Sequence, residues 1–159
     1  MKKILMPFAI ALALLVTVAS CTPEEKVSMI GTYEGNIKTN APLKIKVATV
    51  DMDTTFTTMA GTAIIAETES EDTLGLTVKL EIDGVPINIE NIPAYKVSDS
   101  KITITNYIFK YADAFPMYVN GAATLDGTTL TANVKLSNAP SSLAGTSFDG
   151  DLTFTGEKK

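Results

Sequence analysis

Hydrophobic residues alternate with polar ones along most of this 159-residue chain, and this period of two restricts its fold more than any other feature. The clearest run alternates Leu76, Val78 and Leu80 with Thr77 and Lys79. Such alternation places apolar side chains on one face of a β-strand and polar side chains on the other. No stretch beyond the first 28 residues carries the 3.6-residue hydrophobic stripe of a helix. The chain is therefore predicted to be all-β.

Two Asp-Gly pairs, Asp83-Gly84 and Asp126-Gly127, separate consecutive alternating runs. Glycine tolerates the positive φ of tight turns, so each pair predicts a β-hairpin. Runs of this kind recur from residue 29 onwards and predict eight to ten strands, with a bulge at Gly150 and an irregular stretch over Asp51–Ala60. A meander of consecutive hairpins has to protect its edges. We therefore expect about eight antiparallel strands that close into a barrel, with a two-sheet sandwich as the alternative.

The first 20 residues follow a different pattern. Lys2 and Lys3 precede an apolar run from Ile4 to Ala19, which is 16 residues long, whereas a membrane-spanning helix needs about 20. A charged start, a short apolar core and small residues at its end describe a cleaved signal peptide. Residues 1–20 are thus predicted to be a signal peptide, residues 21–28 a tether and residues 29–159 a single domain.

The residues around the predicted cleavage site are Val18, Ala19, Ser20 and Cys21, and they resemble the lipobox of bacterial lipoproteins. The resemblance implies cleavage after Ser20, attachment of diacylglycerol to the Cys21 thiol, and acylation of the new amine by a chain such as palmitate. An ordinary signal peptide with a chance cysteine is the alternative. Cys21 is the only cysteine and cannot form an internal disulfide, which favours lipid attachment.

Lipid attachment predicts a cell-envelope protein, anchored to the outer membrane through its N-terminus. Glu24 and Glu25 lie close behind Cys21. In some bacterial groups an acidic pair at this place resembles a signal for export to the cell surface, and a solvated linker is the alternative reading. The periplasmic and the surface face of the membrane therefore both stay open.

Composition argues against several functions. Without its two signal lysines the chain has 11 lysines, no arginine and 18 acidic residues, a net charge of −7. This balance argues against nucleic-acid binding, which depends on dense Lys and Arg contacts with phosphates. The chain has no histidine, and lipid would occupy its one thiol, so histidine, thiol and zinc chemistries are removed. No spacing selects a catalytic carboxylate pair or a Ser-Lys dyad. We expect a non-enzymatic protein without a cofactor.

One aromatic group is the candidate recognition surface: Tyr107, Phe109, Tyr111, Phe115 and Tyr118. The first three fall on one face of a predicted strand. If this face points into the barrel, it could line a pocket for a small apolar ligand; if it points outwards, it could stack on sugars or on a partner protein. Plain core filling is the third alternative, since an eight-stranded barrel is just wide enough for side chains or one small ligand.

Asp51 and Asp53 form a weaker candidate, a calcium site, because calcium needs only oxygen ligands. The segment lacks the twelve-residue loop of an EF-hand. Solvated acids at a turn are the alternative.

Four segments resemble the calycin-like (lipocalin-like) domain of small bacterial lipoproteins: 31–37, 85–93, 127–134 and 152–156. A neighbouring family of uncharacterised β-rich lipoproteins is similar to a nearly equal degree. The resemblance implies an eight-stranded antiparallel barrel with no catalytic residue. Tyr33 stands in the place of the lipocalin tryptophan, and the conserved base arginine has no counterpart.

Two functions are consistent with these features. The first is a lipid-anchored binding module for a small apolar ligand or a partner protein. The second is a structural or interaction component of an envelope or surface assembly, which predicts an exposed apolar patch of several hundred Å².

Overall fold

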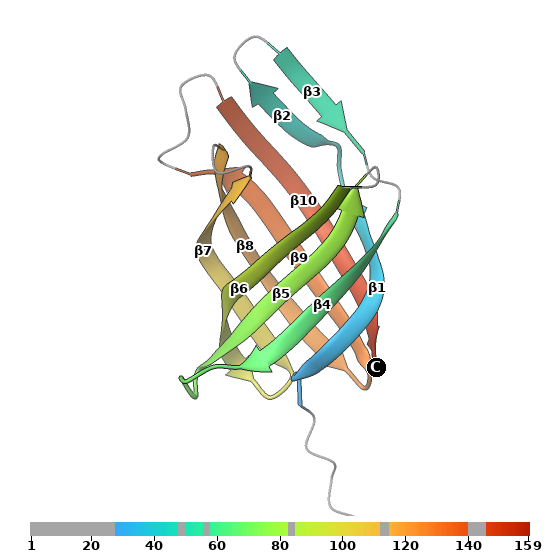
Figure 1. Ribbon diagram of the computed structural model, residues 1–159, viewed down its shortest axis with the longest axis vertical. Helices are drawn as coiled ribbons and strands as arrows, with labels where there is room; N and C mark the ends of the chain where they lie inside the picture. Colours follow the sequence, from blue (N-terminus) through green and yellow to red (C-terminus); the bar gives the residue numbers. More distant parts are fainter. Residues whose placement is uncertain (1–27, 48–49, 56–57, 83–84, 112–114, 140–145) are drawn as a thin grey trace, which may run out of the picture.

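Ten antiparallel β-strands make up the regular structure of the described part of the chain (Figure 1). The computed structural model describes residues 28–47, 50–55, 58–82, 85–111, 115–139 and 146–159. The strands are β1 (Gly31–Thr39), β2 (Leu43–Val47), β3 (Val50–Thr54), β4 (Met59–Glu67), β5 (Thr73–Ile82), β6 (Val85–Ser98), β7 (Lys101–Tyr111), β8 (Phe115–Asp126), β9 (Thr129–Asn138) and β10 (Thr146–Lys158). Within these ranges no helix is long and apolar enough to cross a membrane. The predicted all-β class is confirmed, whereas the signal peptide and Cys21 lie outside the described residues.

Eight of the strands close into a barrel in the order β1-β4-β5-β6-β7-β8-β9-β10, and β10 pairs back with β1 from Tyr33 to Thr39. Ring neighbours are also neighbours in sequence, apart from the excursion of β2 and β3 between β1 and β4. The expected meander that closes into a barrel is confirmed, and the sandwich is not the arrangement. The ring is complete within Gly31–Lys158, so its closure needs no residue before Gly31.

Strands β2 and β3 form a hairpin, here called the flap, that continues the β1–β4 hairpin beyond the barrel rim (Figure 1). β2 prolongs the pairing of β1 along β10. Between the two strands, the Asn40 amide N–H donates to the Asp151 carbonyl at 2.8 Å, and Pro42 has no N–H to continue the ladder. The expected irregular stretch over Asp51–Ala60 is wrong in part, because its first four residues belong to β3 and pair with β2.

The bulge expected at Gly150 is also wrong. β10 pairs with β9 without interruption from Asp149 to Glu157. Gly150 is needed for a different reason: a Cβ placed there would collide with Cδ1 of Leu43, which reaches over from β2. The glycine therefore makes room for a flap side chain instead of bending its strand.

Both Asp-Gly hairpins are present. Gly127 has φ of +59° and turns β8 into β9. The hydroxyls of Thr129 and Thr128 donate to the Glu157 carboxylate at 2.6 and 2.9 Å, and they lower the pKa of that carboxyl group. Residues 83–84 lie outside the described residues, but Ile82 pairs with Val85 across them. The turn chemistry of the sequence thus located these two hairpins correctly.

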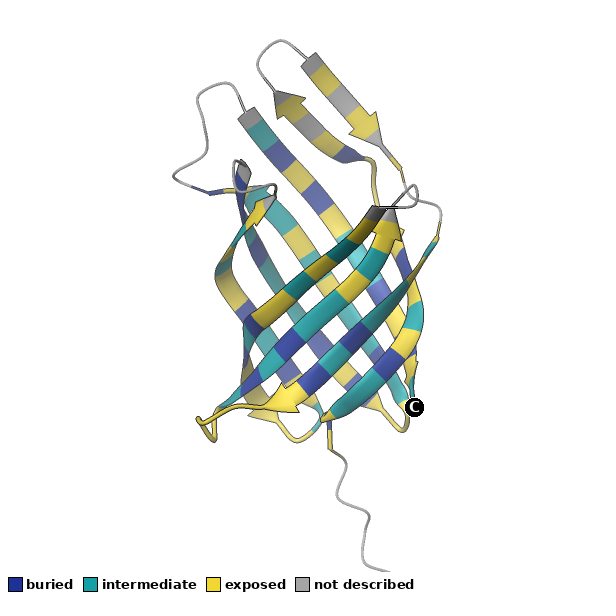
Figure 2. Ribbon diagram, in the orientation of Figure 1, coloured by how far each residue is buried: buried dark blue, intermediate teal, exposed yellow. Residues whose placement is uncertain are grey.

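A packed floor fills the end of the barrel at which residue 28 joins β1 (Figure 2). Its largest fully buried side chains are Tyr33, Ile65, Ile102 and Leu130. Tyr33 has no exposed surface, and its hydroxyl donates to the Met29 carbonyl at 2.8 Å. The tyrosine therefore closes the floor with its one polar atom satisfied.

Burial raises the pKa of the Tyr33 hydroxyl above its usual value of 10.0. Tyr33→Phe removes the hydrogen bond to Met29 and is expected to cost about 1 kcal/mol of unfolding free energy at pH 7. As the pH rises, the tyrosine ionises in the unfolded state before it ionises in the folded state. The contribution of Tyr33 to the unfolding free energy of the wild type is therefore fully present below pH 10 and falls as the pH rises further. The penalty of the variant should therefore shrink above pH 10. Urea unfolding of both proteins at pH 7 and in alkali measures this; a constant difference would contradict it.

Candidate functional site

The interior above the floor contains a cavity of about 560 Å³. Ligand pockets in proteins usually enclose about 300–1,000 Å³. All eight ring strands contribute lining residues, and Leu43 of the flap adds one at the end opposite the floor. Each of the 25 lining residues is apolar. The barrel therefore has a filled lower half and a hollow upper half, both of them hydrophobic.

Small inward-facing residues account for the empty space. Ala63, Ala123 and Ala132 line the cavity from three different strands, and the first two are also buried members of the floor cluster, at its boundary with the cavity. The cavity is also long. Four successive inward positions of β9, from Leu130 to Leu136, line it, and at ~3.3 Å per residue they span about 20 Å along the strand.

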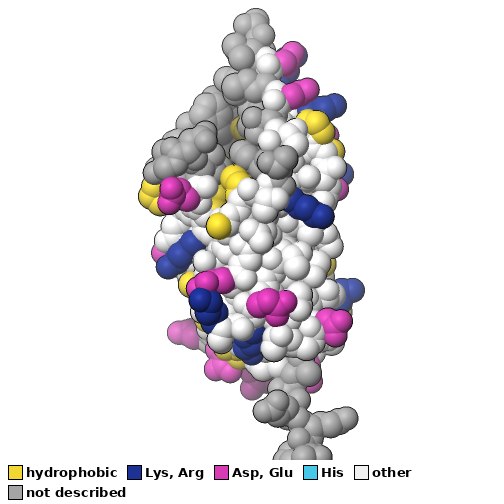
Figure 3. Space-filling model, turned by 90° about the vertical axis from the view of Figure 1, so that its right-hand side faces the viewer, with side chains coloured by type: hydrophobic (Ala, Val, Ile, Leu, Met, Phe, Trp, Pro, Cys, Tyr) yellow, Lys and Arg dark blue, Asp and Glu magenta, His cyan; other side chains and the backbone are white. Residues whose placement is uncertain are grey.

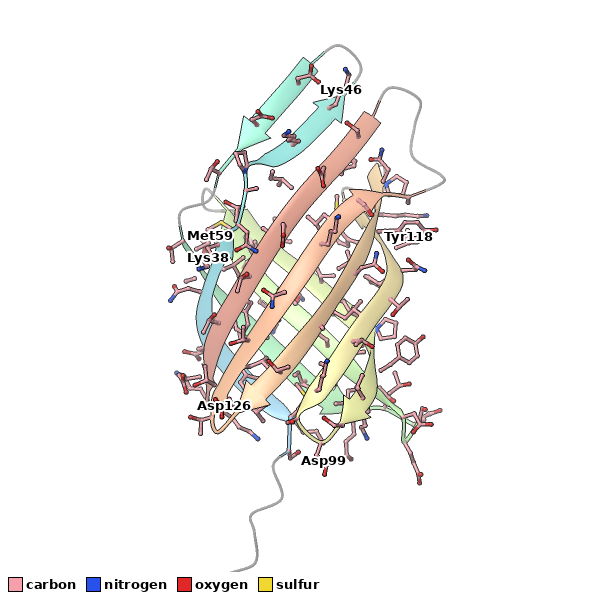
Figure 4. The ribbon with its side chains drawn as sticks, turned by 180° about the vertical axis from the view of Figure 1, so that it is seen from behind. Lys38, Lys46, Met59, Asp99, Tyr118 and Asp126 are labelled. Carbon is pink, nitrogen blue, oxygen red and sulfur yellow. The ribbon has the colours of Figure 1, made fainter. Side chains whose placement is uncertain are left out.

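The three predicted aromatic residues whose side chains are described do not lie on one surface. Phe109 lines the cavity, and Tyr107 packs inwards against the floor cluster. Tyr118 lies between two inward residues of β8 and projects from the outer wall (Figure 4). Tyr111 and Phe115 pair with each other at the ends of β7 and β8, and their side chains lie outside the description. Of the described members, only Phe109 belongs to the cavity wall.

A bulge in β7 explains why Tyr107 and Phe109 face inwards. Ile104 pairs with Gly121 and Tyr107 with Val119, so β7 has one more residue than β8 between these pairs. Asn106 has φ of +49°, which asparagine tolerates better than most residues. Its N–H donates to the side-chain oxygen of Asn120 at 2.7 Å. Before the bulge the even-numbered residues of β7 face inwards, and after it the odd-numbered residues do.

A second bulge changes the phase of β6 in the same way. Val78 pairs with Ile89 and Leu76 with Ile92, and Asn91 between them has φ of +57°. Sequence reasoning missed both bulges. The available signal was an asparagine at each place where the hydrophobic phase switches.

The weak calcium candidates, Asp51 and Asp53, are exposed on the flap and do not line the cavity. Asp51 pairs across the ladder with Lys46, and Asp53 with Lys44. The Lys46 ammonium lies 3.5 Å from a carboxylate oxygen of Asp51. No three potential metal ligands gather anywhere in the described ranges. Asp51 is therefore paired with a lysine, and Asp53 lies opposite one in the ladder.

The chemistry of the cavity is limited to apolar contact. No titratable, nucleophilic or metal-ligating side chain is among its lining residues. Such a site favours an apolar molecule by removing its surface from water, at about 25 cal/mol per Å². Comparison with known proteins adds no relative, because no protein-family model and no curated protein sequence matches the chain.

Proposed function

We propose that this chain is a lipid-anchored cell-envelope protein whose barrel binds a small apolar ligand in the upper cavity. The size and the entirely apolar lining of the cavity carry this proposal. The residues that surround the cavity come from every ring strand, so the site is held by the hydrogen-bonded wall and is preformed. A preformed site loses little conformational entropy when a ligand binds.

Strand β1 starts at the end of the barrel opposite the cavity (Figure 1). Ser28 lies at the floor end, beside the C-terminus, where the Lys158 ammonium donates to its carbonyl at 2.8 Å. The flap and the cavity lie at the other end (Figure 1). Residues 22–28 of the tether, which follow the lipid-bearing cysteine, would span roughly 20 Å when extended. An anchored barrel would therefore present its upper end away from the membrane, towards diffusing ligands or neighbouring proteins.

The surface gives less support to a purely structural role. The large hydrophobic side chains exposed within the described ranges are Ile30, Tyr95, Val97 and Ile108. The face over β1 carries scattered charges of both signs and no broad apolar area (Figure 3). An assembly component would be expected to show a patch of several hundred Å². The cavity is the stronger feature, and ligand binding is therefore the preferred function.

Native mass spectrometry of residues 22–159, purified from the protein's own host, tests the proposal. This form retains every strand of the barrel. We expect a stoichiometric small-molecule adduct that organic extraction removes. A stoichiometric protein partner without a small-molecule adduct would support the assembly role instead.

Cys21→Ser should abolish the anchor. A serine hydroxyl cannot take the place of the thiol as the lipid acceptor, so the variant should not incorporate a labelled palmitate analogue and should keep its signal peptide. Metabolic labelling followed by mass determination measures both effects. The matched control is Ser28→Cys in the wild-type chain, where one label site per molecule should remain. Labelling of Cys21→Ser at the wild-type level would overturn the anchor.

A further inference from the structure

One seam of the barrel wall is hydrogen-bonded over only part of its length. The β6–β7 ladder has three residue pairs, from Ser98↔Lys101 to Tyr95↔Thr103, at the floor end. Each of the other seven seams of the ring has seven to ten pairs. Among the described residues, β6 beyond Tyr95 pairs only with β5, and β7 beyond Thr103 pairs only with β8. We call this unpaired stretch the open seam.

Proline stops the ladder on the β6 side. The Lys96 N–H donates to the Asp72 carbonyl, so even-numbered residues here turn their N–H groups away from β7. Pro93, an odd-numbered residue two positions beyond Tyr95, therefore faces β7 without an N–H to donate. The missing donor also makes this edge a poor template for an added peptide strand, which binds through main-chain hydrogen bonds.

The two asparagine bulges lie directly beyond the paired part. Asn91 is in β6 and Asn106 is in β7, one on each side of the open seam. Bulges bend and twist the strand that carries them. In β7, Asn120 of the neighbouring strand β8 holds the bulge by accepting the Asn106 N–H. The two strands thus diverge at the same level of the barrel, directly beyond their paired part, because each of them carries a bulge there.

Cavity residues line both inner sides of the open seam. Ile87 and Ile89 belong to β6 and Phe109 to β7. On the outer side, Ile108 is 45% exposed, and Asn88, Asn106 and Lys110 are exposed polar neighbours. Unpaired backbone groups of both strands also lie along this edge, and such groups need a polar partner. At the open seam the inner side of the wall is therefore apolar and the outer side is mostly polar.

We propose that the cavity takes a single-chain amphiphile whose hydrocarbon chain lies along the barrel and whose polar head lies in the open seam. This inference rests on the proposed ligand-binding function and specifies its ligand class. The cavity follows β9 for about 20 Å and offers no polar group to a buried head. The open seam supplies polar groups beside that apolar interior. One amphiphile can therefore place its hydrocarbon chain in the cavity and its polar head against these groups.

Tryptophan reporters test this arrangement, because the native chain contains no tryptophan. Single variants of residues 22–159 would carry Phe109→Trp in the cavity, Ile108→Trp beside the open seam, or Lys38→Trp on the opposite wall. Ile108 pairs with Tyr118, and Lys38 and Tyr118 lie at similar heights on opposite sides of the barrel (Figure 4). Lys38→Trp is therefore the matched control. The ligands would be hexadecanoic acid brominated beside its carboxyl group and octadecanoic acid brominated in mid-chain.

Bromine quenches tryptophan at short range. We expect mid-chain bromine to remove most of the Phe109→Trp emission. Bromine beside the carboxyl group should remove most of the Ile108→Trp emission and leave Lys38→Trp unchanged. If Phe109→Trp does not fold, Phe148→Trp on β10 is the second cavity reporter, since Phe148 also lines the cavity.

Two other outcomes separate the two proposals. Quenching of the cavity reporter together with equal or absent quenching at Ile108→Trp and Lys38→Trp would place the head elsewhere and overturn the seam, while ligand binding stands. No quenching of either cavity reporter by either acid would overturn the single-chain amphiphile as the ligand class, and the native mass spectrum would then decide the proposed function separately.

Stapling the open seam provides an independent measurement. Asn88→Cys with Lys110→Cys, joined by bismaleimides of graded length, should slow association of the brominated acids by roughly an order of magnitude. The control for the stapled open seam is Thr62→Cys with Lys79→Cys, a pair across the β4–β5 seam, which is paired without interruption. Equal association rates in the two stapled proteins would contradict access through the open seam.

Discussion

Ala132→Phe is expected to abolish ligand binding and to leave the barrel folded. Ala132 lines the cavity from β9, one inward position beyond Leu130 at its floor and two before Leu136 nearer the flap. A phenyl ring there occupies the space that the ligand would fill. We expect affinity to fall by roughly 100-fold, which corresponds to about 2.8 kcal/mol. Fluorescence titration with N-phenyl-1-naphthylamine, an uncharged apolar ligand, measures the loss.

The same substitution should not lower the melting temperature. Filling an apolar void adds contacts, and such changes commonly raise stability by about 0.5–2 kcal/mol. Lys135→Phe is the matched control, because Lys135 lies on the outer face of the same strand and is exposed. The control should bind with wild-type affinity. Unchanged binding by Ala132→Phe would mean that the ligand site lies outside the cavity, and loss of folding would mean that the space is not empty.

Leu125→Ala is expected to destabilise the protein much more than Leu136→Ala. Leu125 belongs to the packed floor and is 7% exposed. Its truncation leaves a new void among neighbours that cannot collapse, which costs about 3 kcal/mol and lowers the melting temperature by roughly 10 °C. Leu136 already faces the cavity and is only partly buried. Its truncation removes fewer contacts and should cost about 1 kcal/mol.

Thermal and urea unfolding of the two variants compare the same substitution in the two halves of the barrel. Losses of equal size would show that the upper interior is packed as densely as the floor, and the cavity would then be wrong. Ligand titration adds a second contrast, since Leu136→Ala changes the cavity wall and Leu125→Ala does not. We expect altered affinity only in Leu136→Ala.

Most strands follow from local patterns in the chain. Alternation predicts an inward and an outward face for each run, because successive side chains of a strand point to opposite sides. Asp126-Gly127 predicts its hairpin, because glycine at positive φ fits the turn. Strand β3 was missed, because Asp51 and Asp53 are poor strand formers in isolation. Pairing with the lysines of β2 makes them part of a ladder.

The site was less predictable than the strands. Alternation identified the inward residues of β5 and β9, but the same aliphatic residues would serve a filled core or a hollow one. The aromatic residues were predicted as one group on β7 and β8. Tyr107 and Phe109 both follow the bulge at Asn106 and face inwards, whereas Tyr118 lies on the outer face of β8. A periodic pattern assumes an unbroken strand, and a bulge removes that assumption.

Local sequence alone was sufficient for the all-β class, for most of the hairpins, and for the absence of histidine, arginine and a second cysteine. These properties depend on side-chain period, turn residues and composition, which are local. The cavity and the open seam were decided only in the tertiary structure. They depend on how residues from all eight ring strands meet around one axis, and on bulges and a proline that act on neighbouring strands. No single segment contains that information, since each of its residues could equally line a filled barrel.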